Sequence, residues 1–152
     1  MELTKEEILK YQKNIPPYLM MDYITEVVPE KSVNGYKILN EDEWFFQCHF
    51  PGDPNMPGML QVEAIVQLTA MALFTVDENK GKVAYITHLK DAKFLKKVTP
   101  NCKLEMQGKI LSLRRGIAQC EGFATVENKV VCKAKFSLVL PHIVEQYQIK
   151  KS

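Results

Sequence analysis

The sequence predicts an α+β fold in which an antiparallel sheet of about six strands wraps around one long buried helix. The stretch 58–76 has no proline or glycine after Gly58, and its apolar residues cover the whole circumference of a helix, as in helices buried on all sides. After residue 82, β-forming runs alternate with turn residues. A length of 152 residues fits a single domain spanning 1–152.

A short amphipathic helix is expected over residues 4–13. Thr4 is a suitable N-cap, and Glu7 places negative charge in the first turn, where the helix dipole favours it. The Pro16-Pro17 pair ends the helix, because proline cannot continue the hydrogen-bond ladder.

Two strands are expected next, over residues 20–29 and 33–47, because β-branched and aromatic residues are frequent there. The Asn34-Gly35 pair supplies turn chemistry near their junction. The second strand is predicted to end in Trp44-Phe45-Phe46-Gln47-Cys48.

A loop over residues 49–58 separates these strands from the buried helix. It holds three prolines and two glycines, so stiff torsions should keep it ordered. The apolar residues of the helix that follows are Met59, Leu60, Val62, Ala64, Ile65, Val66, Leu68, Ala70, Met71, Ala72, Leu73 and Phe74.

The remaining strands are expected over residues 83–95, 102–113, 116–126 and 129–140. The hairpin breaks between the last three are Arg114-Arg115-Gly116 and Glu127-Asn128-Lys129. The polar tail from Gln146 to Ser152 is expected to fray. A sheet that covers one helix leaves edges to be paired, so we expect a dimer.

Composition excludes several classes of protein. The formal net charge is +2, from 20 basic and 18 acidic side chains, which does not indicate nucleic-acid binding. Cys48, Cys102, Cys120 and Cys132 form no Cys-x-x-Cys pair, so reduced, partly buried thiols are expected rather than disulfides or a zinc site. The first residues contain no apolar leader and no stretch is long enough to span a membrane, so a soluble cytoplasmic protein is expected.

His49 and Glu63 are the candidate catalytic pair. An imidazole can accept a proton near neutral pH, and a carboxyl on an apolar helix should have a raised pKa, as a general acid requires. Gln67 lies one turn further along the same helix face. At the helix start, the Gly58 N–H can approach a ligand oxygen, where the helix dipole favours negative charge.

Structural roles remain open for the same residues. A histidine beside a proline-rich turn is often a packing or capping residue, and a buried glutamate is often paired with a cation. For His88 and His142, which stand alone among predicted strand residues, the structural role is favoured. The methionines are core filler on the simplest interpretation, although Met56 and Met59 flank the site and could line an acyl channel.

The segment HFPGDPNMPGMLQVEAIVQ, residues 49–67, resembles the signature of the 3-hydroxyacyl-[acyl-carrier-protein] dehydratases of bacterial fatty-acid synthesis, a hotdog-fold family. Two other segments are similar to the family pattern: Pro17-Tyr18-Leu19-Met20-Met21-Asp22 and Lys93-Phe94-Leu95-Lys96-Lys97-Val98-Thr99-Pro100. The resemblance spans roughly residues 14–140.

The resemblance implies specific roles. His49 would take a proton from C2 of a 3-hydroxyacyl thioester, and Glu63, from the other subunit of a homodimer, would protonate the departing hydroxyl. The Gly58 amide would hold the thioester oxygen, with Met59, Gln67 and Phe94 completing the substrate site. No cofactor or metal would be needed. The implied partner is acyl carrier protein, and the implied assembly is a homodimer at least, with a trimer of dimers as the larger form.

Some features leave alternatives open. Asn14, Ile15 and Pro16 stand where the family usually has His-Arg-Tyr, and Leu95 replaces an arginine, so a specialised relative is an alternative. A glutamate at position 63 favours a pure dehydratase over a dehydratase–isomerase. A hotdog thioesterase and a non-catalytic acyl-carrier-binding subunit remain the other functions. Lys90, Lys93, Lys96 and Lys97 form a basic segment that is either a solvated strand face or a surface for an acidic carrier protein.

Overall fold

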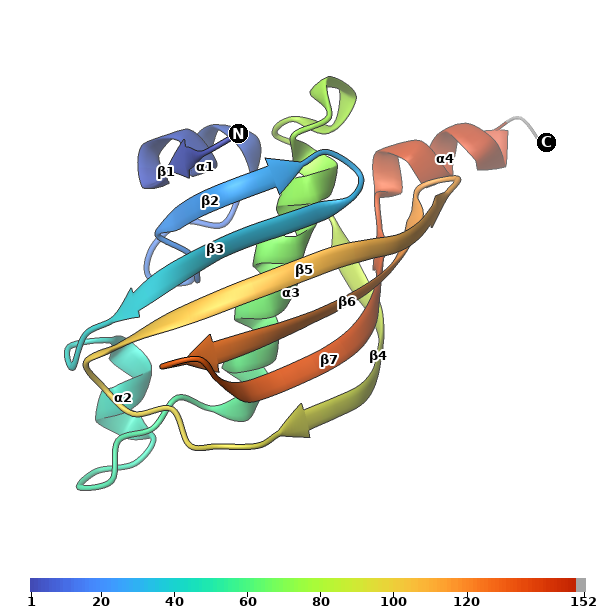
Figure 1. Cartoon of the computed structure of the whole chain (residues 1–152). Coiled ribbons are helices and arrows are strands. Elements are labelled where there is room, and N and C mark those ends of the chain that lie inside the picture. The colour runs from blue at the N-terminus through green and yellow to red at the C-terminus, as the bar shows by residue number, and fades with distance from the viewer. Residues whose placement is uncertain (150–152) are drawn as a thin grey trace.

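The computed structural model describes residues 1–149 and shows one curved sheet packed around one long helix (Figure 1). The described elements are β1 (Leu3–Thr4), α1 (Lys5–Tyr11), β2 (Tyr23–Val28), β3 (Ser32–Leu39), α2 (Trp44–Cys48), α3 (Gly58–Phe74), the 3₁₀ turn η1 (Asp77–Asn79), β4 (Tyr85–Phe94), β5 (Cys102–Arg114), β6 (Ile117–Val126), β7 (Lys129–Val139) and α4 (Pro141–Ile149). Within the described residues the sheet has seven strands in the order β1-β2-β3-β5-β6-β7-β4, and every neighbouring pair is antiparallel.

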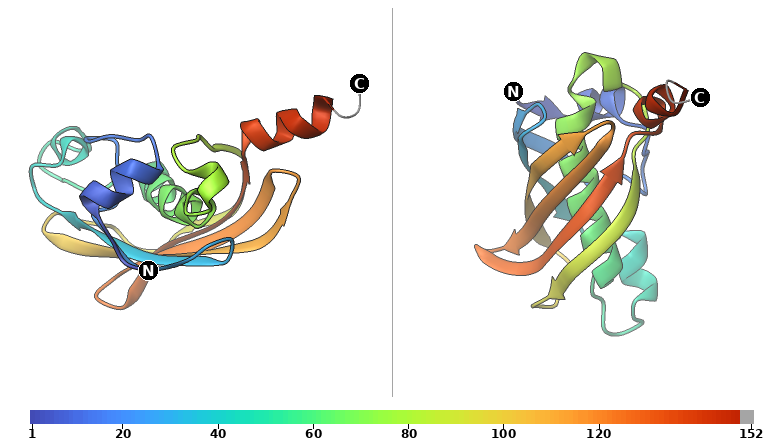
Figure 2. Two further views of the ribbon diagram at one scale, coloured as in Figure 1. Left: turned by 90° about the horizontal axis from the view of Figure 1, so that it is seen from above. Right: turned by 90° about the vertical axis from the view of Figure 1, so that its right-hand side faces the viewer.

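The predicted central helix is confirmed. Helix α3 lies in the concave side of the sheet, as the view from above shows (Figure 2). Thirteen of its 17 residues are buried, including polar Gln61, Gln67 and Thr69. This wrapping is the hotdog arrangement that the resemblance implies, and it gives α3 the all-round burial that its composition requires.

Close approach between α3 and the sheet depends on glycines. Gly108 on β5 lies directly opposite Gly122 on β6. A Cβ at Gly108 would collide with the Thr69 side chain, and a Cβ at Gly122 would lie 2.5 Å from the Ile65 side chain. The helix can therefore sit this close to the middle of the sheet only because neither strand carries a side chain there.

The N-terminal helix is confirmed with a complete capping box. The Thr4 hydroxyl accepts a hydrogen bond from the Glu7 N–H at 3.3 Å, and the Glu7 carboxylate accepts one from the Thr4 N–H at 2.8 Å. The helix is shorter than predicted, and the residues just before it add the two-residue strand β1 to the six predicted strands.

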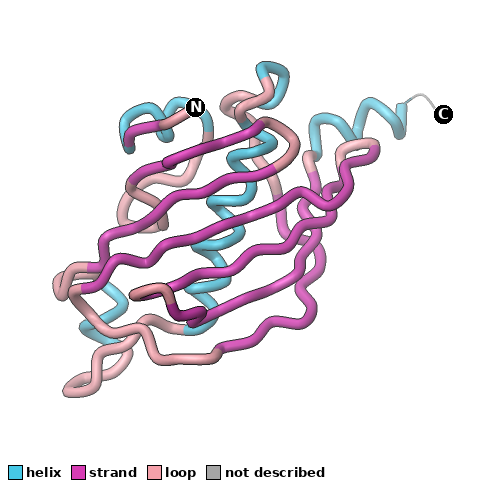
Figure 3. The backbone as a smooth tube through the Cα atoms, viewed as in Figure 1, coloured by secondary structure: helices cyan, strands magenta, loops and turns pink. Residues whose placement is uncertain are grey.

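Two predictions in the next segment are wrong. Residues 44–48 form the helix α2 rather than the end of a strand (Figure 3). Their aromatic side chains favour strands, but β3 ends at Leu39, and Phe45 and Phe46 bury themselves as a one-turn helix in the core. Asn34-Gly35 does not form the turn between β2 and β3. It lies within β3, while the turn falls at Glu30, which has a φ of 64°.

In the C-terminal half, both predicted hairpin breaks are confirmed. Arg115 and Gly116 turn the chain between β5 and β6, and Glu127 and Asn128 between β6 and β7, all with positive φ. The expected fraying is wrong for residues 146–149, which continue helix α4, while residues 150–152 lie outside the described part.

His142 also lies on α4 rather than in a strand. Its Nε2 is 2.8 Å from the Asn79 Oδ1, so it ties the C-terminal helix to the turn that follows α3. This contact fits the structural role that was favoured for His142.

The cysteines are all free. Cys120 and Cys132 are buried, Cys102 is half-buried and Cys48 is exposed. The predicted partial burial is therefore confirmed for three of the four cysteines and is wrong for Cys48. Burial raises the pKa of Cys120 to about 12 and that of Cys132 to about 11, which leaves both as neutral thiols. Among the described helices none is long and apolar enough to cross a membrane.

We predict that Gly108→Ala destabilises the fold by about 1–3 kcal/mol, the usual cost of an overpacked core. The new methyl group would displace Thr69, whose hydroxyl is buried and donates to the Ile65 carbonyl at 2.7 Å. Chemical denaturation of the wild type and the variant measures this change.

The matched test is a double-mutant cycle with Thr69→Ala, which removes the hydroxyl and the methyl group that the new Cβ would meet. The double variant should lose less stability than the two single variants together. Strict additivity would show that the Thr69 hydroxyl and methyl group are not what limits the space at Gly108, because the Cβ of Thr69, 2.8 Å from the new atom, remains in Thr69→Ala.

Candidate active site

The loop that carries His49 is held by its own backbone. The His49 N–H donates to the Phe45 carbonyl at the end of α2, and Phe50 and Asp53 exchange two backbone hydrogen bonds of 2.8 Å. The Met56 N–H donates to the Val98 carbonyl at 2.8 Å. The proline-rich loop is therefore ordered, as predicted, and it presents His49 in one defined position.

One side of the His49 imidazole is fixed. Its Nδ1 lies 2.9 Å from the carbonyl oxygen of Asn55. A carbonyl can only accept a hydrogen bond, so Nδ1 carries a proton, and in the neutral imidazole the lone pair is then on Nε2. The Phe50 ring lies against the imidazole, with 4.0 Å between the ring centroids. This orientation leaves Nε2 of His49 as the ring nitrogen that is available to accept a proton.

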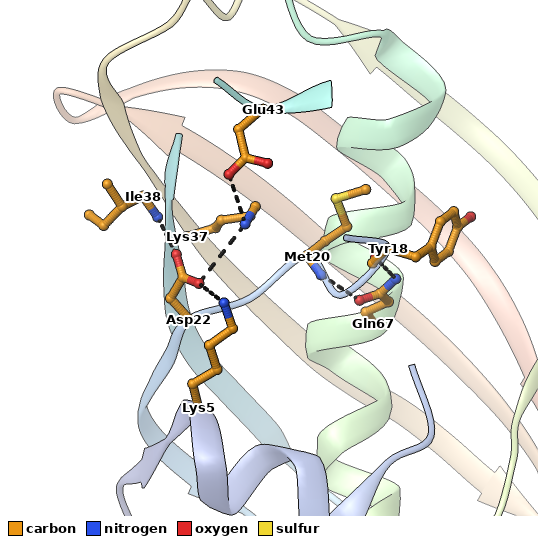
Figure 4. Close-up of polar contacts among 8 residues, drawn as sticks. All are labelled: Lys5, Tyr18, Met20, Asp22, Lys37, Ile38, Glu43 and Gln67. Carbon is orange, nitrogen blue, oxygen red and sulfur yellow. Dashed lines mark hydrogen bonds and ion pairs between the residues drawn. The ribbon is translucent and has the colours of Figure 1, made fainter. Parts of the chain in front are cut away.

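Helix α2, which positions His49, is tied to the sheet by a group of charges. Lys37 on β3 is only 5% exposed and pairs with Glu43, just before α2, at 3.2 Å. It also lies 3.9 Å from Asp22, which accepts a hydrogen bond from the Ile38 N–H and pairs with Lys5 at 3.3 Å (Figure 4). Two carboxylates therefore compensate one buried ammonium at this corner.

Gly58 starts α3, and its N–H belongs to the first turn, where backbone donors have no partner within the helix. A Cβ at Gly58 would lie 2.7 Å from the Phe94 ring. Phe94, at the end of β4, therefore packs directly against the helix N-terminus. The structure brings these two predicted substrate residues together.

Glu63 is half-buried on α3, one turn before the buried Gln67. The Gln67 Nε2 donates to the Glu63 carboxyl at 3.0 Å. Burial raises the pKa of Glu63, while hydrogen bonds from Gln67 and Tyr18 lower it in part. The predicted direction of the shift is confirmed, and a protonated Glu63 is suited to act as a general acid.

The Gln67 amide is fully committed. Its Oε1 accepts a hydrogen bond from the Met20 N–H at 2.8 Å, and its Nε2 also donates to the Tyr18 carbonyl at 3.0 Å (Figure 4). Both hydrogens of Nε2 are therefore used by Tyr18 and Glu63. In this arrangement Gln67 orients the Glu63 carboxyl and has no free donor left for a substrate.

Glu63 faces a cavity of about 320 Å³. Its lining includes Gln67 and Phe74 of α3, the start of β4 at Tyr85 and Ile86, and the segment 12–14. Neither His49 nor Gly58 lines this cavity. Within one chain, this cavity therefore contains Glu63 but not the other two predicted site residues.

The methionines of the site differ in exposure. Met56 is buried, whereas Met59 at the start of α3 is 62% exposed. Met59 is therefore open to a ligand or a second chain, while Met56 belongs to the core. Among residues 1–149, no group of three or more His, Cys, Asp or Glu side chains is placed to hold a metal ion.

The basic segment is larger than the sequence analysis predicted. Lys90 and Lys93 on β4 lie directly opposite Lys135 and Lys133 on β7, and none of these four lysines forms an ion pair within the described chain. Like charges in direct cross-strand pairs destabilise a sheet, although Lys135 also lies opposite Glu121 on β6. The alternation of lysines at 133 and 135 could have indicated that both lie on one strand face.

Lys97, in contrast, is engaged by Asp53 at 2.6 Å, which links the end of the basic segment to the His49 loop. Tyr18 is the other residue near the site that the sequence analysis did not single out. It is far from Gln67 in sequence, and nothing in its own segment indicates that its backbone carbonyl accepts a hydrogen bond from that side chain.

Comparison with known proteins supports a family assignment. A family model described as a FabA-like domain matches residues 14–135. The chain is 40% identical to the 3-hydroxyacyl-[acyl-carrier-protein] dehydratase FabZ of Clostridium novyi over 136 residues, which cover 86% of this chain and 96% of the relative. It is 39% identical to the FabZ of Alkaliphilus metalliredigens, covering 93% of this chain and 98% of the relative.

Among solved structures, the dehydratase heterocomplex ApeI:P of Xenorhabdus doucetiae is similar in fold. The TM-score is 0.75 at 14% identity, covering 95% of this chain and 97% of that one. A hypothetical thioesterase from Streptococcus pneumoniae gives a TM-score of 0.60 at 14% identity, covering 77% and 83%. These likenesses show the hotdog fold. The sequence matches show more: the chain belongs to the FabA-like family, together with these 3-hydroxyacyl-[acyl-carrier-protein] dehydratases.

Proposed function

We propose that this protein catalyses the reversible dehydration of 3-hydroxyacyl-[acyl-carrier-protein] to trans-2-enoyl-[acyl-carrier-protein] and water, in fatty-acid or related lipid synthesis. The observation that carries the proposal is the identity with FabZ dehydratases over almost the whole chain. The site supports it, since it offers an oriented imidazole base and a carboxyl with a raised pKa.

In the proposed step, His49 Nε2 takes the proton from C2 of the substrate. The C2–H electron pair forms the C2=C3 double bond, the C3–O bond breaks, and the hydroxyl leaves as water with the proton of Glu63. The N–H of Gly58 stabilises the negative charge that develops on the thioester oxygen. The elimination is redox-neutral, and proton transfer by two positioned groups suffices for it.

We further propose that the working unit is a homodimer formed by two β4 strands. Strand β4 is an edge of the sheet, and almost all of its side chains are exposed. The exposed apolar residues Tyr85, Ile86 and Leu89 follow its first half, and Phe94 ends it. Such an edge is suited to pair with a second copy.

This pairing would unite the divided site. In an antiparallel β4–β4 pair around a two-fold axis, the start of one strand lies beside the end of the other. The start, at Tyr85 and Ile86, lines the Glu63 cavity, and the end, at Phe94, contacts Gly58. Glu63 of one chain would then face His49 of its partner, as the family resemblance implies.

The carrier protein would approach along the basic surface. Lys90, Lys93 and Lys96 belong to β4 and the segment after it, next to the Phe94–Gly58 contact. We propose that they steer an acidic acyl carrier protein, which raises the association rate more than the affinity. Phe94 and the exposed Met59 would then line the path of the acyl chain.

We predict that His49→Ala and Glu63→Gln each lower the dehydration rate by about 10²–10⁴-fold, the usual contribution of a general base or acid. The assay follows the ultraviolet absorbance of the enoyl thioester formed on acyl carrier protein. Release of free thiol without enoyl product would indicate a thioesterase instead, and binding of acyl carrier without any turnover would indicate a non-catalytic subunit.

The composite site predicts that inactive variants complement each other. When His49→Ala and Glu63→Gln chains are co-expressed with different tags, each mixed dimer should hold one intact site and one doubly altered site. Purified mixed dimers should therefore regain activity, while each variant alone stays inactive. Mixed dimers as inactive as their parents would place both residues of a site in the same chain.

The raised pKa of Glu63 predicts a specific pH dependence. In the dehydration direction the acid must be protonated, so activity is present below the pKa of Glu63 and falls as pH rises through it. Hydration is the reverse reaction and takes up no net proton, so the ratio of the two kcat/KM values cannot depend on pH and both must fall at the same midpoint. Profiles of kcat/KM in both directions check this, and one shared midpoint on their alkaline side is the expected result.

A further inference from the structure

We propose that Lys97 and Asp53 are positioning residues for the base, because their ion pair fixes the part of the loop whose carbonyl orients the His49 imidazole. Neither side chain is assigned a contact with the reacting atoms, so both act through His49. This inference deepens the proposed function and rests on it. It assigns the alignment of the proposed base to two residues for which the family resemblance implies no role.

The segment that carries Lys97, just after β4, is anchored on both sides. The Leu95 and Lys96 N–H groups donate to the Val131 carbonyl on β7, at 2.8 and 3.4 Å. On the other side, Val98 is only 1% exposed and belongs to the core. The backbone of Lys97 therefore has a defined position, from which its side chain reaches the loop.

The loop contacts this segment at two points. The Lys97 Nζ donates to the Asp53 Oδ1 at 2.6 Å. The Met56 N–H donates to the Val98 carbonyl at 2.8 Å. Asn55, whose carbonyl accepts the hydrogen bond from the Nδ1 of the base, lies between these two points in the chain. The acceptor that orients the imidazole is therefore held from both ends.

The connection from Asp53 to the base is stiff. Pro54 has a fixed φ and also restricts the backbone of Asp53 before it. The Asn55 Nδ2 donates to the Asp53 carbonyl at 3.1 Å, and the Asn55 N–H donates to the His49 carbonyl at 2.9 Å. A displacement of Asp53 should therefore move the Asn55 carbonyl and, with it, the imidazole.

The size of the expected effect follows from the exposure of the pair. The side chains of Lys97 and Asp53 are 52% and 60% exposed. Exposed ion pairs contribute little free energy, so removing this one should lower the population of aligned loops by only about 2–5-fold. The backbone hydrogen bonds of the loop remain, and the loop should still form.

The test is Asp53→Ala, which removes the carboxylate and leaves the basic segment intact. A short 3-hydroxyacyl pantetheine thioester without carrier protein is the substrate, so that carrier docking does not enter the result. We expect kcat for dehydration to fall by about 2–5-fold while KM stays unchanged. With carrier-bound substrate, an unchanged kcat and a lower KM would instead show that Asp53 only masks Lys97 from the carrier, which would overturn the proposal.

Two further variants separate positioning from a general loss of charge. Exchanging the charges, with Asp53→Lys and Lys97→Asp together, should recover part of the kcat that each single change loses. The matched control is Glu105→Gln, which removes the ion pair of Lys103 with Glu105 on β5. That pair is similarly exposed, at 48% for both side chains, and its loss should leave kcat unchanged.

A spectroscopic readout reports on the imidazole itself. The sequence has three histidines, and His49→Ala identifies the His49 signals in nitrogen-15 NMR of ring-labelled protein by their absence. Neutral His49 should carry its proton on Nδ1 in the wild type, because the hydrogen bond to Asn55 selects that tautomer. In Asp53→Ala we expect the signals to move toward those of mixed tautomers.

The outcomes distinguish the two proposals. Unchanged tautomer signals in Asp53→Ala would overturn the positioning role, even in an active dehydratase, and so would an unchanged kcat in such an enzyme. A tautomer shift in a protein that has no dehydratase activity would uphold the positioning of the imidazole by the ion pair while refuting the proposed function.

Discussion

Helix α3 has to be buried on every side, and this requirement determines how the sheet is shaped. Its residues offer no polar face for water, so the sheet must curve around it, and the paired glycines Gly108 and Gly122 let the sheet come close enough. The side that the sheet does not close is the one with the Glu63 cavity, next to the unpaired edge strand β4. The burial of α3 that forms the fold thus leaves Glu63 beside the unpaired edge strand β4.

Polar groups inside such a fold need fixed partners, and Gln67 shows how one side chain supplies them. Its oxygen is committed to the Met20 N–H, so its nitrogen must face the Tyr18 carbonyl and Glu63. The amide cannot be reversed without opposing donor to donor and acceptor to acceptor. The orientation of the Glu63 carboxyl therefore depends on the backbone of Tyr18 and Met20, which lies far from it in sequence.

Much of this arrangement could be predicted from the sequence because the signals are local. The buried helix follows from its composition, the last hairpins from their turn residues, and the His49 loop from its prolines. Helix α2 was missed because its aromatic residues favour strands, and tertiary burial overrode that preference. The hydrogen bond of Gln67 with the Tyr18 carbonyl and the alignment of Lys133 with Lys93 depend on strand register and chain topology, which no single segment encodes.

The charge cluster at the corner of β3 and α2 has a consequence for how this chain can evolve. Lys37 is buried between Asp22 and Glu43, so replacing either acid alone leaves the buried ammonium with one carboxylate partner instead of two, and replacing Lys37 alone leaves two carboxylates close together. Changes at these three positions are therefore coupled, and each single step passes through a less stable intermediate. Sequences that diverge from this one should exchange the three residues as a unit or keep them all.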